Sequence, residues 1–86
     1  MARSIGVIEC DCYSDVVAAA DRLIKAADVR LKRREEIGDG HVALIIEGET
    51  DEVERGLAAA KEGAPESLWT TLVPNASNRV ASVFKL

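Results

Sequence analysis

The spacing of hydrophobic positions changes twice within the first half of the chain. From Arg3 to Cys10, apolar residues fill both alternating sides, which is typical of a strand that is covered on both faces. From about Asp15 to Ala27 the spacing becomes that of one helix face, formed by Val16, Ala20, Leu23, Ile24 and Ala27. Ser14 is expected to cap this helix, because a serine hydroxyl accepts hydrogen bonds from free backbone N–H groups. A strand and then an amphipathic helix are predicted.

The spacing shortens to two residues between Val29 and Ile37. Val29, Leu31 and Ile37 share one side, and mostly charged residues occupy the other, so this segment predicts a strand with one face in water. After a Gly-Asp-Gly break, residues 41–46 are apolar on both sides and predict a further buried strand.

A second helix and a fourth strand are predicted in the remainder of the chain. Thr50 is expected to cap the helix, which stops near Gly63 and Pro65. Its apolar face is formed by Val53, Leu57, Ala60 and Ala64. Residues 67–73 predict a strand, and Val80, Val83 and Phe84 have the spacing of a short helix.

This order of elements is β-α-β-β-α-β, the α+β ferredoxin-like arrangement in which both helices cover one face of an antiparallel sheet. We expect residues 3–74 to form one domain, and residues 75–86 to form a C-terminal tail or short helix. Two of the strands are apolar on both sides, so the helix-free face also needs a cover. Another subunit is an obvious candidate for covering this face.

The composition argues against several classes of binding partner. Hydrophobic residues make up 48% of the 86 residues but aromatic residues only 3%, which argues against an aromatic platform for single-stranded nucleic acid. The net charge of −4 argues against a general polyanion binder. No segment reaches the ~18 consecutive apolar residues of a membrane span, and the N-terminus lacks a signal-peptide pattern. A cytoplasmic protein with neither nucleic acid nor membrane as a partner is expected.

Two cysteines form a Cys10-x-Cys12 motif. In the cytoplasm both thiols would be reduced, and this spacing along one strand does not favour a disulfide. A tetrahedral thiolate site needs about four ligands, and no second cysteine pair follows. We therefore expect two small, partly buried hydrophobic residues, with a metal site completed across subunits as the alternative. No metal or cofactor is predicted.

The Gly38-Asp39-Gly40 break has three possible interpretations. A phosphate cradle normally has a helix behind its glycines, whereas a strand follows here. A calcium loop needs more oxygen ligands at fixed spacing. A hairpin turn, in which the glycines supply positive φ, fits best for a single chain. His41 is the only histidine and has no nearby nucleophile, so no catalytic residue is predicted.

Four segments together resemble a known family: "SIGVIE", "AAADRLIKAADV", "EIGDGHVALIIEG" and "LVP". They are similar, in this order and spacing, to the bacterial microcompartment (BMC) shell-protein domain in its unpermuted, single-domain form. The resemblance implies a structural protein without enzymatic activity. It implies homohexamers that pack edge to edge into a shell, alongside other shell proteins and around encapsulated enzymes.

The resemblance also implies roles for individual residues. Ile37, Gly38, Asp39, Gly40 and His41 would line or border a central pore for small metabolites. Lys25 and Asn75 would lie at the edge between hexamers, Asn75 at a position where the family usually has an arginine. An amide does not replace a guanidinium in such a contact.

Asp39 stands where the family usually has a small neutral residue. Six copies would form an acidic ring that favours neutral or cationic metabolites over anions. Two other functions remain open: a small ferredoxin-like ligand-binding regulatory domain, which would act as a dimer, and a small hydrolase. The lack of a convergent nucleophile and base counts against the hydrolase.

Overall fold

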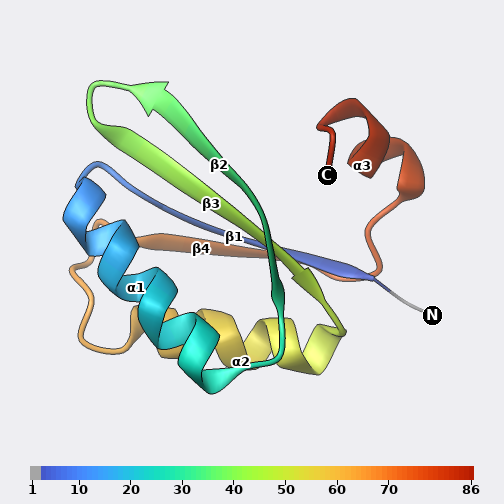
Figure 1. The fold of residues 1–86 in the computed structure, drawn as a ribbon, viewed down its shortest axis with the longest axis horizontal. Coiled ribbons are helices and arrows are strands. Elements are labelled where there is room, and N and C mark those ends of the chain that lie inside the picture. Colours follow the sequence, from blue (N-terminus) through green and yellow to red (C-terminus); the bar gives the residue numbers. More distant parts are fainter. Residues whose placement is uncertain (1–2) are drawn as a thin grey trace.

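A four-stranded sheet separates two long helices from one short C-terminal helix (Figure 1). The computed structural model describes residues 3–86. The elements are β1 (Ser4–Cys10), α1 (Tyr13–Ala26), β2 (Arg30–Gly38), β3 (His41–Gly48), α2 (Thr50–Lys61), β4 (Trp69–Val73) and α3 (Asn78–Val83). This order confirms the predicted β-α-β-β-α-β arrangement with a short C-terminal helix.

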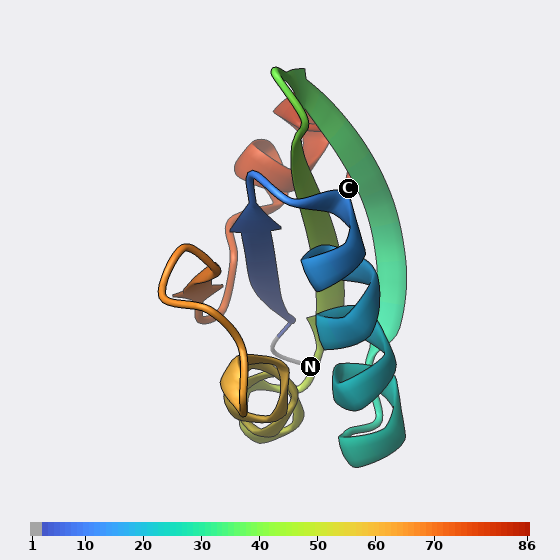
Figure 2. The same ribbon diagram turned by 90° about the vertical axis from the view of Figure 1, so that its left-hand side faces the viewer.

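The strands follow the spatial order β2-β3-β1-β4, and every neighbouring pair is antiparallel. Figure 2 shows α1 and α2 side by side on the same face of the sheet, as the ferredoxin-like arrangement requires. Gly6 of β1 allows α2 to come close, because a Cβ atom there would lie 2.8 Å from Cγ1 of Val53.

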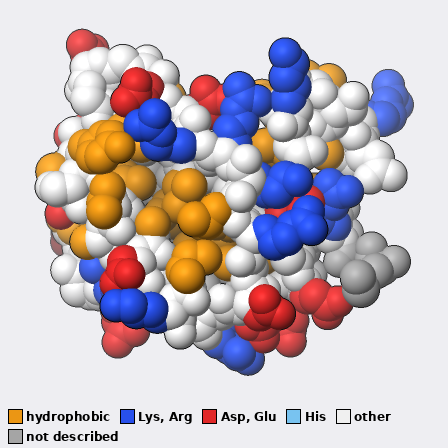
Figure 3. Space-filling view, viewed as in Figure 1, with side chains coloured by type: hydrophobic (Ala, Val, Ile, Leu, Met, Phe, Trp, Pro, Cys, Tyr) orange, Lys and Arg blue, Asp and Glu red, His pale blue; other side chains and the backbone are white. Residues whose placement is uncertain are grey.

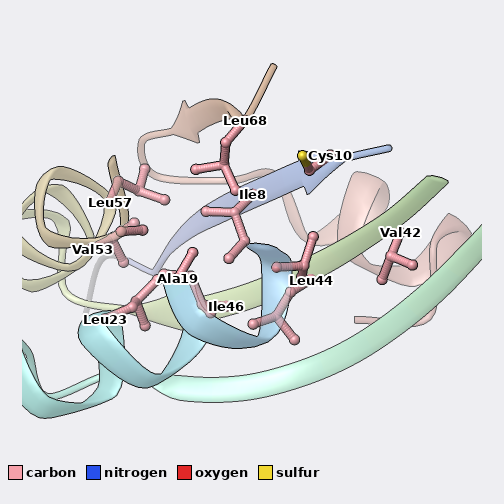
Figure 4. Close-up of a cluster of buried hydrophobic side chains, with 12 residues drawn as sticks. Ile8, Cys10, Ala19, Leu23, Val42, Leu44, Ile46, Val53, Leu57 and Leu68 are labelled. Atoms are coloured by element: carbon pink, nitrogen blue, oxygen red, sulfur yellow. The ribbon is translucent and has the colours of Figure 1, made fainter. Parts of the chain in front are cut away.

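The hydrophobic core fills the space between the sheet and the two long helices (Figure 4). Every second residue of β1 and β3 points into it, since Ile8 pairs with Leu44 and Cys10 with Val42. The fully buried side chains include Ile8, Cys10, Leu23, Ile46, Val53 and Leu68. The core therefore consists almost entirely of aliphatic residues, as the composition indicates.

Both predicted helix caps are wrong. Helix α1 begins at Tyr13 with Cys12 as its N-cap, and α2 begins at Thr50 with Glu49 as its N-cap. The Ser14 hydroxyl lies 3.2 Å from the sulfur of Cys12 and caps no backbone group. The Thr50 hydroxyl forms a 2.6 Å hydrogen bond with that of Ser4. At Thr50 a contact between distant residues overrides the local capping preference, whereas at Ser14 the contact is with a residue only two positions away.

The buried face of α1 also differs from the prediction. Val16, Ala19 and Leu23 are buried, whereas Ile24 is 43% exposed. The helix packs on α2 as well as on the sheet: a Cβ at Gly56 of α2 would lie 3.1 Å from Cγ of Leu23. This second contact turns the Leu23 face inward and leaves Ile24 at the surface.

The chain itself supplies part of the cover for the helix-free face. Figure 1 shows α3 on the opposite side of the sheet from α1 and α2. Backbone N–H of Ala76 donates to the carbonyl of Arg3 at 2.8 Å, and Arg33 donates to the carbonyl of Phe84 at 3.0 Å. Ile5, on this face, is only 3% exposed. The C-terminal segment therefore covers part of the face for which another subunit was the expected cover.

The short C-terminal helix is present, but the apolar residues whose spacing predicted it lie at the surface. Val80, Val83 and Phe84 are 44%, 74% and 62% exposed, whereas Ala81 is buried. Ser77 caps this helix by accepting a hydrogen bond from the backbone N–H of Arg79.

Candidate pore loop and edge residues

The β2–β3 hairpin projects beyond the other strands and carries four of the five expected pore residues at or next to its turn (Figure 1). Gly38 pairs with His41, so Asp39 and Gly40 form a two-residue turn. Both have positive φ, 52° and 78°, as a type I′ hairpin requires. The hairpin interpretation of the Gly-Asp-Gly break is therefore confirmed.

The side chains of this loop differ in exposure. Ile37 is 61% exposed, and Asp39 is exposed with no ion pair to another residue of the 3–86 range. His41 is half-buried, and its Nε2 lies 3.4 Å from a carboxylate oxygen of Glu9 on β1. The loop thus presents an uncompensated carboxylate to solvent at its tip.

The two expected edge residues lie in separate parts of the fold. Lys25, in the last turn of α1, forms a 2.8 Å ion pair with Asp21. The hydrogen bond to Asp21, with its coulombic attraction, raises the pKa of Lys25 above the ordinary 10.5. Asn75 follows β4 in a left-handed conformation (φ 50°), and its backbone N–H donates to the Ser4 hydroxyl. Both side chains are exposed and available to a neighbouring molecule.

A charge cluster on the sheet has no counterpart in the sequence prediction. The carboxylate of Glu47 on β3 is paired with Arg3 and Arg30 at 2.8 Å, and with Lys32 at 3.8 Å. Its side chain is 8% exposed. The sequence contains one signal for this cluster, the opposite charges of Arg30 and Glu47. Only the strand register shows that these two residues are cross-strand partners.

Exposed apolar side chains also gather on the helix side of the molecule. Tyr13, Val17 and Ile24 on α1 are between 43% and 54% exposed, and Leu31 on β2 is 51% exposed. Figure 3 shows hydrophobic side chains clustered over this region of α1 and the neighbouring strands. We call these four residues the α1–β2 apolar surface. A surface of this kind is typical of a contact with another protein.

The described residues offer no metal centre. Within residues 3–86 there is no group of three or more His, Cys, Asp or Glu side chains placed to hold a metal ion. Cys10 is buried, Cys12 is half-buried and both are free thiols, in line with the expectation of small, partly buried residues. No helix of the described range is long and apolar enough to span a membrane.

Comparison with known proteins decides the family. The sequence model of the BMC domain matches residues 4–76. The chain belongs to the BMC-domain family. A structure of a microcompartment protein from Desulfitobacterium hafniense DCB superposes with a TM-score of 0.83 and 28% sequence identity, covering 93% of this chain and 45% of that one. The BMC-domain fold is therefore the one described above.

Curated relatives in this family are carboxysome shell proteins. CcmK1 of Thermosynechococcus vestitus is 44% identical over 72% of this chain and 55% of its own length. CcmK2 of Synechocystis sp. is 41% identical over 74% of this chain and 62% of its own length. CsoS1A of Hydrogenovibrio crunogenus is 41% identical over 71% of this chain and 60% of its own length. The chain thus spans between about half and two thirds of these relatives.

These relatives are shell proteins and not enzymes, which agrees with the expectation that this chain is not an enzyme. Family and relatives together identify a microcompartment shell component.

Proposed function

We propose that six copies of this chain form a ring whose centre is an acidic pore lined by the β2–β3 hairpin. The observation that carries the proposal is the position of Asp39 at the tip of a projecting hairpin, exposed and without an ion pair inside the described chain. Six such carboxylates around one axis would create a negative potential that admits neutral or cationic metabolites and opposes anions.

The backbone of the hairpin supports this role. With Asp39 and Gly40 at positive φ, the turn is tight and fixed by its strand pairing, so the backbone that carries the Asp39 carboxylate has a defined position. Ile37 and His41 flank it on the two strands and would form the walls of the pore mouth.

Assembly requires surfaces that a single chain leaves open. The α1–β2 apolar surface provides one, because burying it between copies would remove exposed apolar area from water. Lys25 and Asn75, both exposed, would lie at the outer edge of the ring and contact neighbouring hexamers in a sheet. Other shell proteins and encapsulated enzymes would be the remaining partners.

Measuring the assembly state tests the proposal most directly. Analytical ultracentrifugation of the full chain should give six-chain particles, and electron microscopy should show rings that pack into hexagonal sheets. Two variants sharpen the test: Val17→Glu at the apolar surface should break the ring, whereas the control Glu54→Lys, at an exposed position on α2 away from that surface, should not. A stable monomer or dimer of the unmodified chain would overturn the proposal.

A further inference from the structure

A hollow of 170 Å³ lies at the hairpin end of the sheet, lined by Asp11, His41, Ser67 and Trp69. These residues come from just beyond the end of β1, from the start of β3 and from the approach to and start of β4, which meet here because the strands are antiparallel. Glu9 pairs directly with Trp69, so the two side chains project from the same face of the sheet.

The hollow lies close to the turn of the hairpin. A Cβ atom at Gly40 would be 3.5 Å from the carbonyl oxygen of Asp11, so the turn and the rim of the hollow lie close together. Any molecule held in the hollow would therefore be next to the loop that carries Asp39.

The lining combines an aromatic surface with uncompensated negative charge. Asp11 has no ion pair with any basic residue of the 3–86 range, and a carboxylate oxygen of Glu9 lies 3.4 Å from Nε2 of His41. Trp69 is 64% exposed, and no described Lys or Arg lies over its ring. Tryptophan beside carboxylates is the combination with which proteins hold organic ammonium groups.

We propose that this hollow binds a small alkylammonium ion. Its volume equals that of about six water molecules at roughly 30 Å³ each, which suits a ligand of five or six heavy atoms. Asp11 and the Ser67 hydroxyl accept hydrogen bonds from the ammonium N–H groups, and the Trp69 ring covers the alkyl part and attracts the charge.

The competing ligand classes fit the hollow less well. An anion would face the carboxylates of Asp11 and Glu9. A metal ion would lack ligands, since the described residues hold no suitable group of three. A role in holding cations on their way to the pore depends on the proposed function. Binding of an alkylammonium ion to the hollow does not depend on it.

Trp69 is the only tryptophan, so its fluorescence in the full, assembled chain reports directly on the hollow. The probes are tert-butylammonium, tert-butanol and trimethylacetate, which share a tert-butyl group and carry charges of plus one, zero and minus one. Tert-butylammonium should change the emission in a saturable way at millimolar concentration, and the other two should bind at least about tenfold more weakly.

Two variants separate the hollow from general electrostatics. Asp11→Asn should weaken tert-butylammonium binding about fivefold or more, whereas Asp28→Asn, which removes the same charge before β2, should leave it within twofold. Equal responses to the three probes, no effect of Asp11→Asn, or an assembled ring in which acrylamide cannot quench Trp69 would each overturn the proposal. Selective binding by a chain that stays monomeric would support this site and overturn the hexamer.

Discussion

Arg30 on β2 donates a 2.8 Å hydrogen bond to Oε1 of Glu47 on β3. Arg3 reaches the other carboxylate oxygen at 2.8 Å, and Lys32 lies 3.8 Å away. A carboxylate that is only 8% exposed would lose much of its hydration without such partners. Because three cations surround one anion, removing the anion leaves like charges facing each other across the strands.

Glu47→Gln is expected to lower the free energy of unfolding by roughly 1–3 kcal/mol. The amide keeps the shape of the side chain but cannot balance the three cations. Their repulsion is screened by salt, so the loss should be larger at low ionic strength than at high. Urea unfolding at two salt concentrations measures both effects. Glu54→Gln, an exposed charge on α2, is the control and should change stability by less than about 0.5 kcal/mol. Equal losses in the two variants would contradict the prediction.

Gly38→Ala should destabilise the hairpin by about 1–2 kcal/mol through the backbone alone. Gly38 has φ 114°, which an L-residue rarely adopts, yet a Cβ there would meet no atom within 4 Å. D-alanine at the same position has no such strain, so a chemically synthesised chain with D-alanine should retain the unfolding free energy of the unmodified protein. A comparable loss with both enantiomers would mean that the side chain, and not φ, is responsible. Thermal unfolding followed by circular dichroism provides the comparison.

The order of the elements could be predicted because the hydrophobic period directly reflects which side of each element is buried. The start of α2 could not be predicted, because the predicted cap residue Thr50 is engaged by a residue far away in the sequence. The Ser4–Thr50 hydrogen bond joins residues 46 positions apart, and it occupies the hydroxyl that local preference would place at the N-cap. The exposure of Ile24 has a similar cause, because the packing of α1 on α2 sets the rotation of the helix.

The turn of the candidate pore loop could also be predicted, because positive φ at a Gly-Asp-Gly sequence is a local property. The surroundings of Glu47 and the hollow beside Trp69 could not. Each of these two sites brings together residues from three separate segments of the chain. These residues are close to one another only because of the strand register. A shift of one residue would place these side chains on the other face of the sheet.

The ion pair between Lys25 and Asp21 should be visible in the titration of Lys25. Its pKa in the folded chain is raised above 10.5, first by the hydrogen bond and then by coulombic attraction, and Asp21→Asn should return it towards the ordinary value. Because the folded pKa exceeds the unfolded one, the stabilisation is fully present below pH 10.5 and is lost as pH rises through the raised pKa. Carbon-13 NMR of the lysine side chains, in conditions where sheets do not form, measures the shift. An unchanged Lys25 titration in Asp21→Asn would contradict it.

Replacing Asp39 should change which solutes cross an assembled shell. Asp39→Asn removes the charge and retains a residue that tolerates the left-handed φ of 52°, so the turn is preserved. Loss of six carboxylates from the proposed pore should lower the ratio of ammonium to carboxylate permeation by about tenfold, because the ring would no longer attract one sign and repel the other. Flux of methylammonium and of acetate into shells that contain a trapped indicator measures this ratio. Asp39→Ser, which is also neutral, should give the same result.

The control for Asp39 is Asp28→Asn, which would remove the same number of charges from the proposed hexamer but at a residue before β2, away from the hairpin. It should leave the permeation ratio within about twofold, since exposed charges more than a Debye length of ~10 Å from the solute are screened. Raising the salt concentration should reduce the selectivity of the unmodified pore and have little effect on Asp39→Asn. If the two neutral variants at position 39 retain the original ratio while the rings stay intact, the acidic ring does not select by charge and another part of the pore sets its permeability.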